Sequence, residues 1–336
     1  MTTERISMPI TYNALVIDNI NEKTDIRIKE LQLDPLKENE VTIKVSYSSV
    51  NYKDGLATLP KGGVVKNWPH IPGIDMAGTI IQSRDKKFKE GDEVLCTGYD
   101  LGVSRSGGYT EITQIPTKWL VKIPSKLTMR HSMMLGTAGF TASLAITQMS
   151  ENGLNPDFEN CIITGASGGV GSIATILLSN KNIEVTAVTG KQTAHTILSE
   201  LGAKYFLSRE EASIDSRPLE KEVWSAAIDQ VGGKMLSWIL PQIKYKGKCA
   251  VTGLTGGAKF ESTVLPLILR GISILGVDSV FCPMQKRLEI WDTLAEDINT
   301  PLLEKIVTET NFKGLPKILN EILKGEITGR TIVKIN

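Results

Sequence analysis

The stretch CIITGASGGVGSIATILL, Cys161–Leu178, joins two apolar runs through a glycine-rich turn. The first run is typical of a buried strand and the second of a helix. Between them, Ala166, Gly168 and Gly171 occupy the positions of the GxGxxG pattern, with alanine in place of the first glycine. In that pattern the second glycine lets the backbone approach a pyrophosphate, and the third lets the helix pack closely on the strand. The turn is therefore either a phosphate cradle or a plain corner between a strand and a helix.

The residues around the turn favour the cradle. A strand (CIIT) precedes it, a helix (VGSIATILLSN) follows, and a second strand (IEVTAVTG) comes next. A dinucleotide-binding turn requires this order, because the helix N-terminus presents unpaired N–H groups to anionic oxygens. We therefore expect a nucleotide to contact the turn at five residues: Ser167, Gly168, Gly169, Val170 and Gly171.

The end of the next strand indicates which nucleotide binds. An NAD site usually has a carboxylate there, which hydrogen-bonds the ribose 2′-hydroxyl. This chain has Thr189, Gly190 and Lys191 instead, and Arg209 follows the strand after that. The missing carboxylate and the two cations favour NADP. Alternatively, Lys191 and Arg209 are ordinary solvated charges.

The rest of the chain shows two different patterns of predicted secondary structure. From Tyr12 to about Ile123, short β-rich runs alternate with turns, which is typical of a largely antiparallel β domain. From about Thr128, helical runs alternate with apolar strands, which indicates βαβ units and a parallel sheet with helices on both faces. The end of the chain reads as helix, strand, helix and closing strand. The predicted class is α/β.

Composition excludes several classes of protein. The chain has 336 residues, 41% hydrophobic and 22% charged, with a net charge of +1, so nothing favours binding to nucleic acid or an anionic membrane. No apolar run is long enough to cross a membrane. The opening MTTERISMPI lacks the apolar core of a signal peptide. Four cysteines without a CxxC spacing suit a reducing cytoplasm, and we read them as buried small apolar residues.

Several segments together resemble a known family. The segments are SSVNYKD, IPGIDMAG, LGTAGFTA, TGASGGVGS, SRPLEKEVW and GVDSV, and the match extends to GRTIVKIN at the end. They resemble the acrylyl-CoA reductases, or YhdH/YhfP-type quinone oxidoreductases, of the medium-chain dehydrogenase/reductase superfamily. The resemblance implies a GroES-like catalytic domain (1–128, completed by 283–336) and a Rossmann NADP-binding domain (129–282).

The resemblance also implies a reductase without zinc. Zinc-using members have a cysteine in the segment that reads SSVNYKD here, and a His-Glu pair where this chain has Ile74 and Asp75. Zinc needs nitrogen, sulfur or oxygen donors that converge in a tetrahedron. Tyr52 stands near the first position, no cysteine cluster occurs, and we assign none of the three histidines to chemistry.

The same resemblance places three further residues at the cofactor. Tyr52 is expected beside the nicotinamide, as a hydrogen-bond donor or as a group that positions the ring. The alternative is a strand-end tyrosine that anchors the domain. Leu254 and Ser279 end later strands and are expected beside the nicotinamide half. Asp54 is interpreted as orienting its loop, and Asp75 as a structural hydrogen-bond acceptor.

The implied function is NADPH-dependent reduction of an activated C=C bond, with acryloyl-CoA converted to propionyl-CoA. Reduction of a quinone or an aldehyde is the alternative within the enzyme class, and a non-catalytic NADPH-binding sensor is the alternative outside it. Lys61 and Lys66, in the loop LPKGGVVKNWPH, are candidates for CoA phosphates unless that loop is only solvated surface. We expect a cytoplasmic protein. We also expect a homodimer, because SILGVDSVF is predicted to form an apolar edge strand that can pair with a second copy.

Overall fold

The chain folds into two compact units. The computed structural model describes residues 10–21 and 23–335, so the expectation about a signal peptide lies almost wholly outside the described residues. The first unit comprises Met1–Gly136, Glu309–Glu326 and Thr331–Asn336, and the second comprises Thr137–Thr308 and Ile327–Arg330.

These units divide the chain at different residues from the predicted domains. Residues 283–308, which the sequence analysis assigned to the catalytic domain, belong to the second unit. The reason is visible in the packing, because Arg287 and Trp291 both lie against Phe140 of that unit. The functional boundaries 1–128, 129–282 and 283–336 stay a prediction.

The second unit is built on a six-stranded parallel sheet, in the order β10-β9-β8-β11-β12-β13. Relative to the chain, this is the order 3-2-1-4-5-6 of a doubly wound dinucleotide-binding fold, which confirms the Rossmann prediction. The strands are β8 (Asn160–Ile163), β9 (Glu184–Val188), β10 (Ala203–Leu207), β11 (Trp224–Asp229), β12 (Ile243–Val251) and β13 (Ser273–Gly276).

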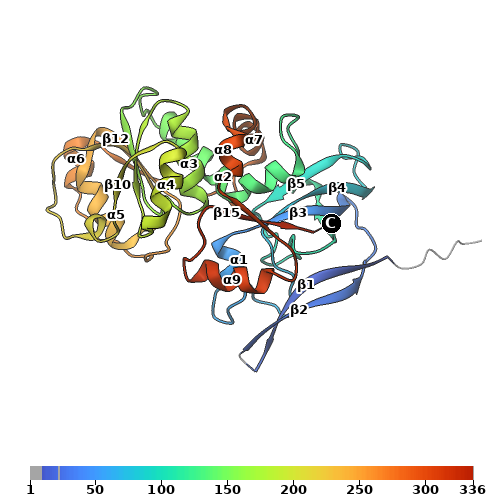
Figure 1. Cartoon of the computed structure of the whole chain (residues 1–336). Helices are drawn as coiled ribbons and strands as arrows, with labels where there is room; N and C mark the ends of the chain where they lie inside the picture. Colours follow the sequence, from blue (N-terminus) through green and yellow to red (C-terminus); the bar gives the residue numbers. More distant parts are fainter. Residues whose placement is uncertain (1–9, 22, 336) are drawn as a thin grey trace, which may run out of the picture. The chain divides into compact units, whose positions relative to one another are not determined.

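Helices lie on both sides of this sheet (Figure 1). Leu236 and Ile239 share a buried core with Ile162 and Cys249 of the strands, so the apolar character of the strands on that face is explained by helix cover. The helices of this unit are the part of α2 (Met129–Glu151, interrupted at Gly136) that follows Gly136, and α3 (Gly169–Ser179), α4 (His195–Glu200), α5 (Gly233–Ile239), α6 (Leu265–Arg270), α7 (Met284–Asp297) and α8 (Thr300–Glu304).

The first unit contains the antiparallel sheet that the sequence predicted. The strand order is β14-β15-β3-β4-β5-β7, with β6 also paired to β3, and a separate hairpin joins β1 to β2. Val41, Ile43 and Val45 of β3 share a buried core. On the opposite face Lys44 is exposed, whereas Thr42 is buried. The strands are β1 (Thr11–Ile20), β2 (Lys23–Gln32), β3 (Glu40–Val50), β4 (Asp75–Ser83), β5 (Glu93–Thr97), β6 (Ile112–Pro116), β7 (Val121–Lys122), β14 (Val307–Thr310) and β15 (Arg330–Lys334).

Two short helices of the first unit pack directly on each other: α1 (Tyr52–Ala57) and α9 (Leu315–Leu323) (Figure 1). A β-carbon at Gly55 would lie 2.9 Å from side-chain atoms of both Ile322 and Leu323, so only glycine permits this approach. Helix α9 therefore supports the segment that carries Tyr52.

Two sequence predictions about composition can be compared with the described residues. All four cysteines are free and buried, which confirms their interpretation as small apolar residues. Within residues 10–21 and 23–335, no helix combines the length and apolar character that a membrane span needs.

Candidate active site

The glycine-rich turn lies between β8 and α3, as predicted. Gly168 is the N-cap of α3, with extended backbone (φ −85°, ψ 178°), and its N–H donates to the Gly165 carbonyl at 2.9 Å. Gly165, rather than Ala166, takes the left-handed conformation (φ 55°). The alanine that replaces the first glycine of the motif is therefore tolerated, because the residue before it makes the tight turn.

The two remaining glycines have different roles. A β-carbon at Gly171 would lie 2.6 Å from Ala166 Cα and 2.7 Å from the Gly165 carbonyl oxygen, so the helix approaches the turn too closely for any side chain. A β-carbon at Gly168 would meet only the Gly165 oxygen, at 3.3 Å. The space beside Gly168 is otherwise open, as a site for an approaching phosphate requires.

The turn sits where the strand order reverses, with β9 on one side of β8 and β11 on the other. Ligands of doubly wound sheets bind at this point. Buried Asp229, at the end of β11, accepts hydrogen bonds from Thr164 Oγ1 (2.6 Å) and from the N–H of Gly232 (2.8 Å), while burial raises its pKa. Asp229 thus ties the cradle turn to the loop after β11. No sequence motif singles out this residue.

The residues at the end of β9 join the cradle. Thr189 Oγ1 donates to Ser167 Oγ at 3.0 Å and accepts from the N–H of Lys191 at 3.1 Å. Arg209 lies across Gly190, so close that a β-carbon there would be 2.8 Å from Arg209 Nε. The structure therefore gathers the predicted Ser167, Thr189, Gly190, Lys191 and Arg209.

A pocket of about 570 Å³ opens beside this group. Two reciprocal bonds hold one part of its lining: the Ser208 N–H donates to the Glu211 carboxylate at 2.7 Å, and the Glu211 N–H donates to the Ser208 hydroxyl at 3.1 Å. The lining residues are Thr189, Gly190, Lys191, Gln192, Thr193, His195, Phe206, Leu207, Ser208, Glu210 and Glu211.

The C-terminal segment Ile327–Arg330 lies against the same cradle. Lys191 Nζ donates to the Ile327 carbonyl (2.8 Å) and to Thr328 Oγ1 (3.2 Å), so its charge is held in place rather than freely solvated. The buried Arg330 packs on the first turn of α3, with Nη1 3.2 Å from the β-carbon position of Gly169. Arg330 belongs to the segment GRTIVKIN, and nothing in that segment's sequence indicates this contact.

Leu254 and Ser279 follow the neighbouring strands β12 and β13. Leu254 is 60% exposed, and its carbonyl accepts the N–H of Gly257 at 3.0 Å. Val277, two residues before Ser279, still pairs with the end of β12, because its N–H donates to the Val251 carbonyl at 3.0 Å. Both residues therefore lie beyond carboxyl ends of parallel strands, where the prediction placed them.

Tyr52 belongs to the first unit, whereas the other eleven predicted site residues belong to the second. It is the first residue of α1 and is 36% exposed. Its place beside a cofactor stays a prediction.

Two buried carboxyl groups support the start of α1. Asp54 accepts the N–H groups of Asn51 (2.8 Å) and Ile74 (2.9 Å), which confirms that it orients this loop. Asp75 accepts from Ser49 Oγ (2.6 Å) and Asn51 Nδ2 (2.8 Å), which confirms its structural role. Burial, together with the nearby Asp75 charge, raises the pKa of Asp54 to about 7.

The loop with Lys61 and Lys66 is partly fixed by apolar contacts. Val65 is buried, and Val64 and Trp68 pack against the same core. Both lysines are exposed, so their contact with CoA stays a prediction.

Comparisons with known proteins agree over nearly the whole chain. Residues 37–125 match the alcohol dehydrogenase GroES-like domain, and residues 169–295 match the zinc-binding dehydrogenase family. The acrylyl-CoA reductase AcuI of Ruegeria pomeroyi is 44% identical over 97% of this chain and 99% of its own. The putative quinone oxidoreductase YhfP of Bacillus subtilis is 43% identical over 98% of this chain and 100% of its own.

The chain belongs to the acrylyl-CoA reductase and YhfP family of medium-chain oxidoreductases.

Solved structures of this family agree with the fold. The YhdH oxidoreductase of Salmonella enterica, in complex with NADP, is 41% identical over 96% of this chain and 100% of its own, with a TM-score of 0.93. YhfP of B. subtilis with NAD bound is 43% identical over 97% of this chain and 99% of its own, also with a TM-score of 0.93. Members of the family have thus been observed with either dinucleotide.

The name of one matching family mentions zinc, but this chain differs at the expected ligands. Ile74, which replaces the superfamily's histidine, is buried and has no donor atom. Across the described residues, no three His, Cys, Asp or Glu side chains converge on a possible metal position. Zinc independence stays a prediction.

Proposed function

We propose that this protein is an NADPH-dependent reductase of an activated C=C bond, with acryloyl-CoA as its substrate. The observation that carries the proposal is the full-length similarity to an acrylyl-CoA reductase, combined with an intact phosphate cradle. The NADP of the Salmonella relative and the NAD of the Bacillus relative leave the cofactor to be argued from this chain's own residues.

Those residues favour NADP. The end of β9 carries no carboxylate to repel a 2′-phosphate, while Lys191 follows Gly190 directly and Arg209 packs against it. The N-terminus of α3 and the Arg330 guanidinium suit a pyrophosphate, because both are donors with positive charge or dipole. Kd values for NADPH and NADH test this assignment, and equal affinities would contradict it.

NADPH, when bound, would supply a hydride to the substrate's β-carbon, and a proton from solvent at the α-carbon would complete the reduction. The protein's part is to orient both partners and to stabilise the charge that develops on the thioester oxygen. We assign a hydrogen-bond donor role to the Tyr52 hydroxyl, supported by α9 beneath α1 and by the Asp54 bonds. Conjugated thioesters suit a metal-free site, since the carbonyl group itself takes up the charge.

Absorbance at 340 nm tests the proposal directly. With NADPH, we expect a kcat/KM for acryloyl-CoA of at least about 10³ M⁻¹s⁻¹ and much slower turnover of 1,4-benzoquinone and simple aldehydes. Quinone reduction is the second candidate, because the YhfP relative carries that name. Faster turnover of a quinone than of any enoyl-CoA would show that quinone reduction is the function and would contradict the enoyl-CoA proposal. Tight NADPH binding without oxidation by any acceptor would indicate a sensor.

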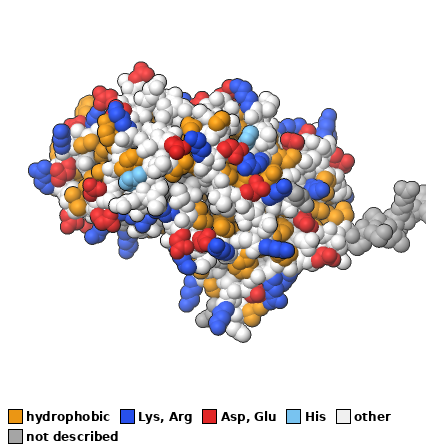
Figure 2. Space-filling view, in the orientation of Figure 1, with side chains coloured by type: hydrophobic (Ala, Val, Ile, Leu, Met, Phe, Trp, Pro, Cys, Tyr) orange, Lys and Arg blue, Asp and Glu red, His pale blue; other side chains and the backbone are white. Residues whose placement is uncertain are grey.

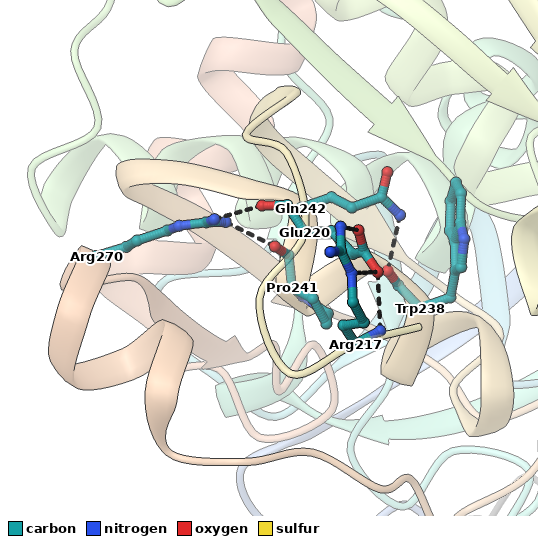
Figure 3. Close-up of polar contacts among 6 residues, drawn as sticks. All are labelled: Arg217, Glu220, Trp238, Pro241, Gln242 and Arg270. Carbon is teal, nitrogen blue, oxygen red and sulfur yellow. Dashed lines mark hydrogen bonds and ion pairs between the residues drawn. The ribbon is translucent and has the colours of Figure 1, made fainter. Parts of the chain in front are cut away.

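We also propose that the protein is a homodimer that pairs through the β13 edge. In the described part of the chain, β13 ends the parallel sheet. Val264, Ile268 and Leu269, at the N-cap and within the helix α6 that precedes β13, are each more than half exposed. Arg270 fixes this region by donating to the Pro241 and Glu220 carbonyls (Figure 3). Ile268→Lys is expected to lower the mass measured by light scattering from a dimer to a monomer. A monomeric wild type would contradict the proposal.

The remaining proposals concern cell location and partners. Charged side chains of both signs are interspersed over the face in Figure 2, which suits a protein that does not bind nucleic acid. Four free, buried thiols suit the cytoplasm. Cell fractionation and a DNA-binding assay at low salt test these two points.

A further inference from the structure

The backbone of the loop that follows β13 is hydrogen-bonded by two side chains. Asp278 Oδ1 accepts the N–H groups of Val280 (2.9 Å) and Phe281 (3.1 Å). On the other side of the loop, Arg287 Nη2 donates to the carbonyls of Ser279 (3.1 Å) and Val280 (3.1 Å). Two side chains of opposite charge therefore hold three consecutive residues of the loop.

Arg287 is itself held firmly. It belongs to α7, its side chain is completely buried, and its guanidinium lies 4.6 Å from the centre of the Phe140 ring. The Phe140 ring also stacks on the ring of Trp291, which lies one turn after Arg287 in α7, and the two ring centres are 6.2 Å apart. A buried guanidinium is costly unless its hydrogen bonds are well made, so this side chain strongly favours one conformation of the loop.

These bonds leave Ser279 as the residue that the loop can offer to a ligand. The carbonyls of Ser279 and Val280 and the N–H groups of Val280 and Phe281 are already used. Among the described residues, no hydrogen bond within the chain uses the Ser279 N–H or hydroxyl. Both groups can donate to an amide oxygen such as that of a nicotinamide carboxamide.

We propose that Arg287 is a positioning residue for the nicotinamide half of the cofactor, acting through the backbone of Ser279 and Val280. The inference rests on the proposed function and on the expectation, drawn from the family resemblance, that Ser279 lies beside that half. Arg287 does not touch the cofactor. It fixes the loop before binding, so that ordering this loop costs nothing when the cofactor arrives.

The test compares a ligand that contains the nicotinamide half with one that lacks it. Kd values for NADPH and for adenosine 2′,5′-bisphosphate are measured on wild type, Arg287→Lys, Arg287→Met and Asp278→Ala. We expect Arg287→Met and Asp278→Ala to raise the Kd for NADPH about tenfold and to leave the Kd for the bisphosphate unchanged. Lysine retains one charged donor, so Arg287→Lys is expected to lie between wild type and Arg287→Met.

Turnover supplies a second readout. At saturating NADPH and acryloyl-CoA, kcat is expected to fall in Arg287→Met because the ring is poorly held, and to recover partly in Arg287→Lys. Lys286→Met is the matched control, since it removes the same charge one residue away, where Lys286 pairs with Glu151 and Glu289 on the surface. The Kd values of Lys286→Met for NADPH and for the bisphosphate are expected to equal those of wild type.

Each outcome decides the inference. If Arg287→Met does not fold, Asp278→Ala is decisive, because that exposed residue braces the same loop from the other side. An unchanged ratio of the two Kd values in Asp278→Ala and Arg287→Lys would overturn the positioning role. Equal losses for both ligands would overturn it too, since they indicate general damage. Failure of wild type to bind either ligand would instead overturn the proposed function.

Discussion

Alanine substitutions at two glycines of the cradle are expected to separate binding from stability: Gly168→Ala should weaken NADPH binding in a stable protein, whereas Gly171→Ala should lower stability first. In Gly168→Ala, the backbone angles suit alanine and the new methyl meets only the Gly165 oxygen at 3.3 Å. Alanine also leaves the unfolded chain with fewer conformations than glycine does. This stabilises the folded protein by about 0.4–1 kcal/mol and offsets the cost of the tight contact. We therefore expect an unfolding free energy within about 1 kcal/mol of wild type.

Gly171→Ala introduces a methyl against two backbone atoms at 2.6 and 2.7 Å and against Gln230 Nε2 at 2.8 Å. Backbone atoms cannot rotate away, so the helix must shift, and overpacking of this kind costs about 1–3 kcal/mol. This variant is expected to lose stability first and NADPH affinity as a consequence.

The assay combines urea unfolding with an NADPH titration of the folded protein. In Gly168→Ala, the methyl occupies the open side of the turn where the pyrophosphate approaches, so the Kd for NADPH is expected to rise at least about tenfold, or 1.4 kcal/mol. Wild-type NADPH affinity in Gly168→Ala would refute the cradle. A loss of stability in Gly168→Ala as large as in Gly171→Ala would refute the assignment of different roles to the two glycines.

Four further predictions concern the cofactor, the proton, the metal and the hydroxyl. Lys191→Ala and Arg209→Ala are each expected to raise the Kd for NADPH by roughly 10- to 100-fold, because a hydrogen bond to a charged group contributes about 1.5–3 kcal/mol, while titration with NADH changes little. The pKa of Asp54 is about 7 in the folded protein and about 4 in the unfolded chain, so between these pH values the folded protein holds a proton that the unfolded chain has lost. The free energy of unfolding is therefore expected to fall as pH rises from about 4 to 7. Asp75→Asn removes the neighbouring charge and should flatten that fall in urea unfolding series; an identical slope would contradict the coupling. Elemental analysis is expected to find no stoichiometric zinc, and chelators should leave turnover intact; one essential zinc per chain would contradict this. Tyr52→Phe should lower kcat more than it weakens NADPH binding, and a change in Kd alone would assign Tyr52 to cofactor positioning.

The sequence was sufficient for features that depend on local pattern. The strand, glycine turn and helix around Gly168 were predicted correctly because apolar runs and glycines mark them directly. The order of the two secondary-structure patterns also predicted a parallel and an antiparallel sheet. Strand β2 (Lys23–Gln32) was not predicted, because only Ile26 and Ile28 alternate with charged residues before Glu30 interrupts the apolar face.

Residues whose roles depend on tertiary contacts were beyond the reach of the sequence. Arg330 lies on the first turn of α3, and Asp229 bonds to the turn after β8, although both are remote from Gly168 in the chain. Neither has a local pattern that distinguishes it from a surface charge. Lys191 was predicted as a cation at the rim, but its bond to the Ile327 carbonyl required the folded chain.

The short passage Ile327–Arg330 limits how far the nucleotide unit can be treated as a transferable module. Residues 309–326 before it and 331–336 after it belong to the other unit, yet these four residues supply the Lys191 acceptor and the Arg330 guanidinium. A fragment cut at residue 308 would keep every strand of the parallel sheet and still lack one wall of its cradle. Chimeras between relatives must therefore exchange this tetrapeptide together with the sheet, and the two segments are expected to evolve as a pair.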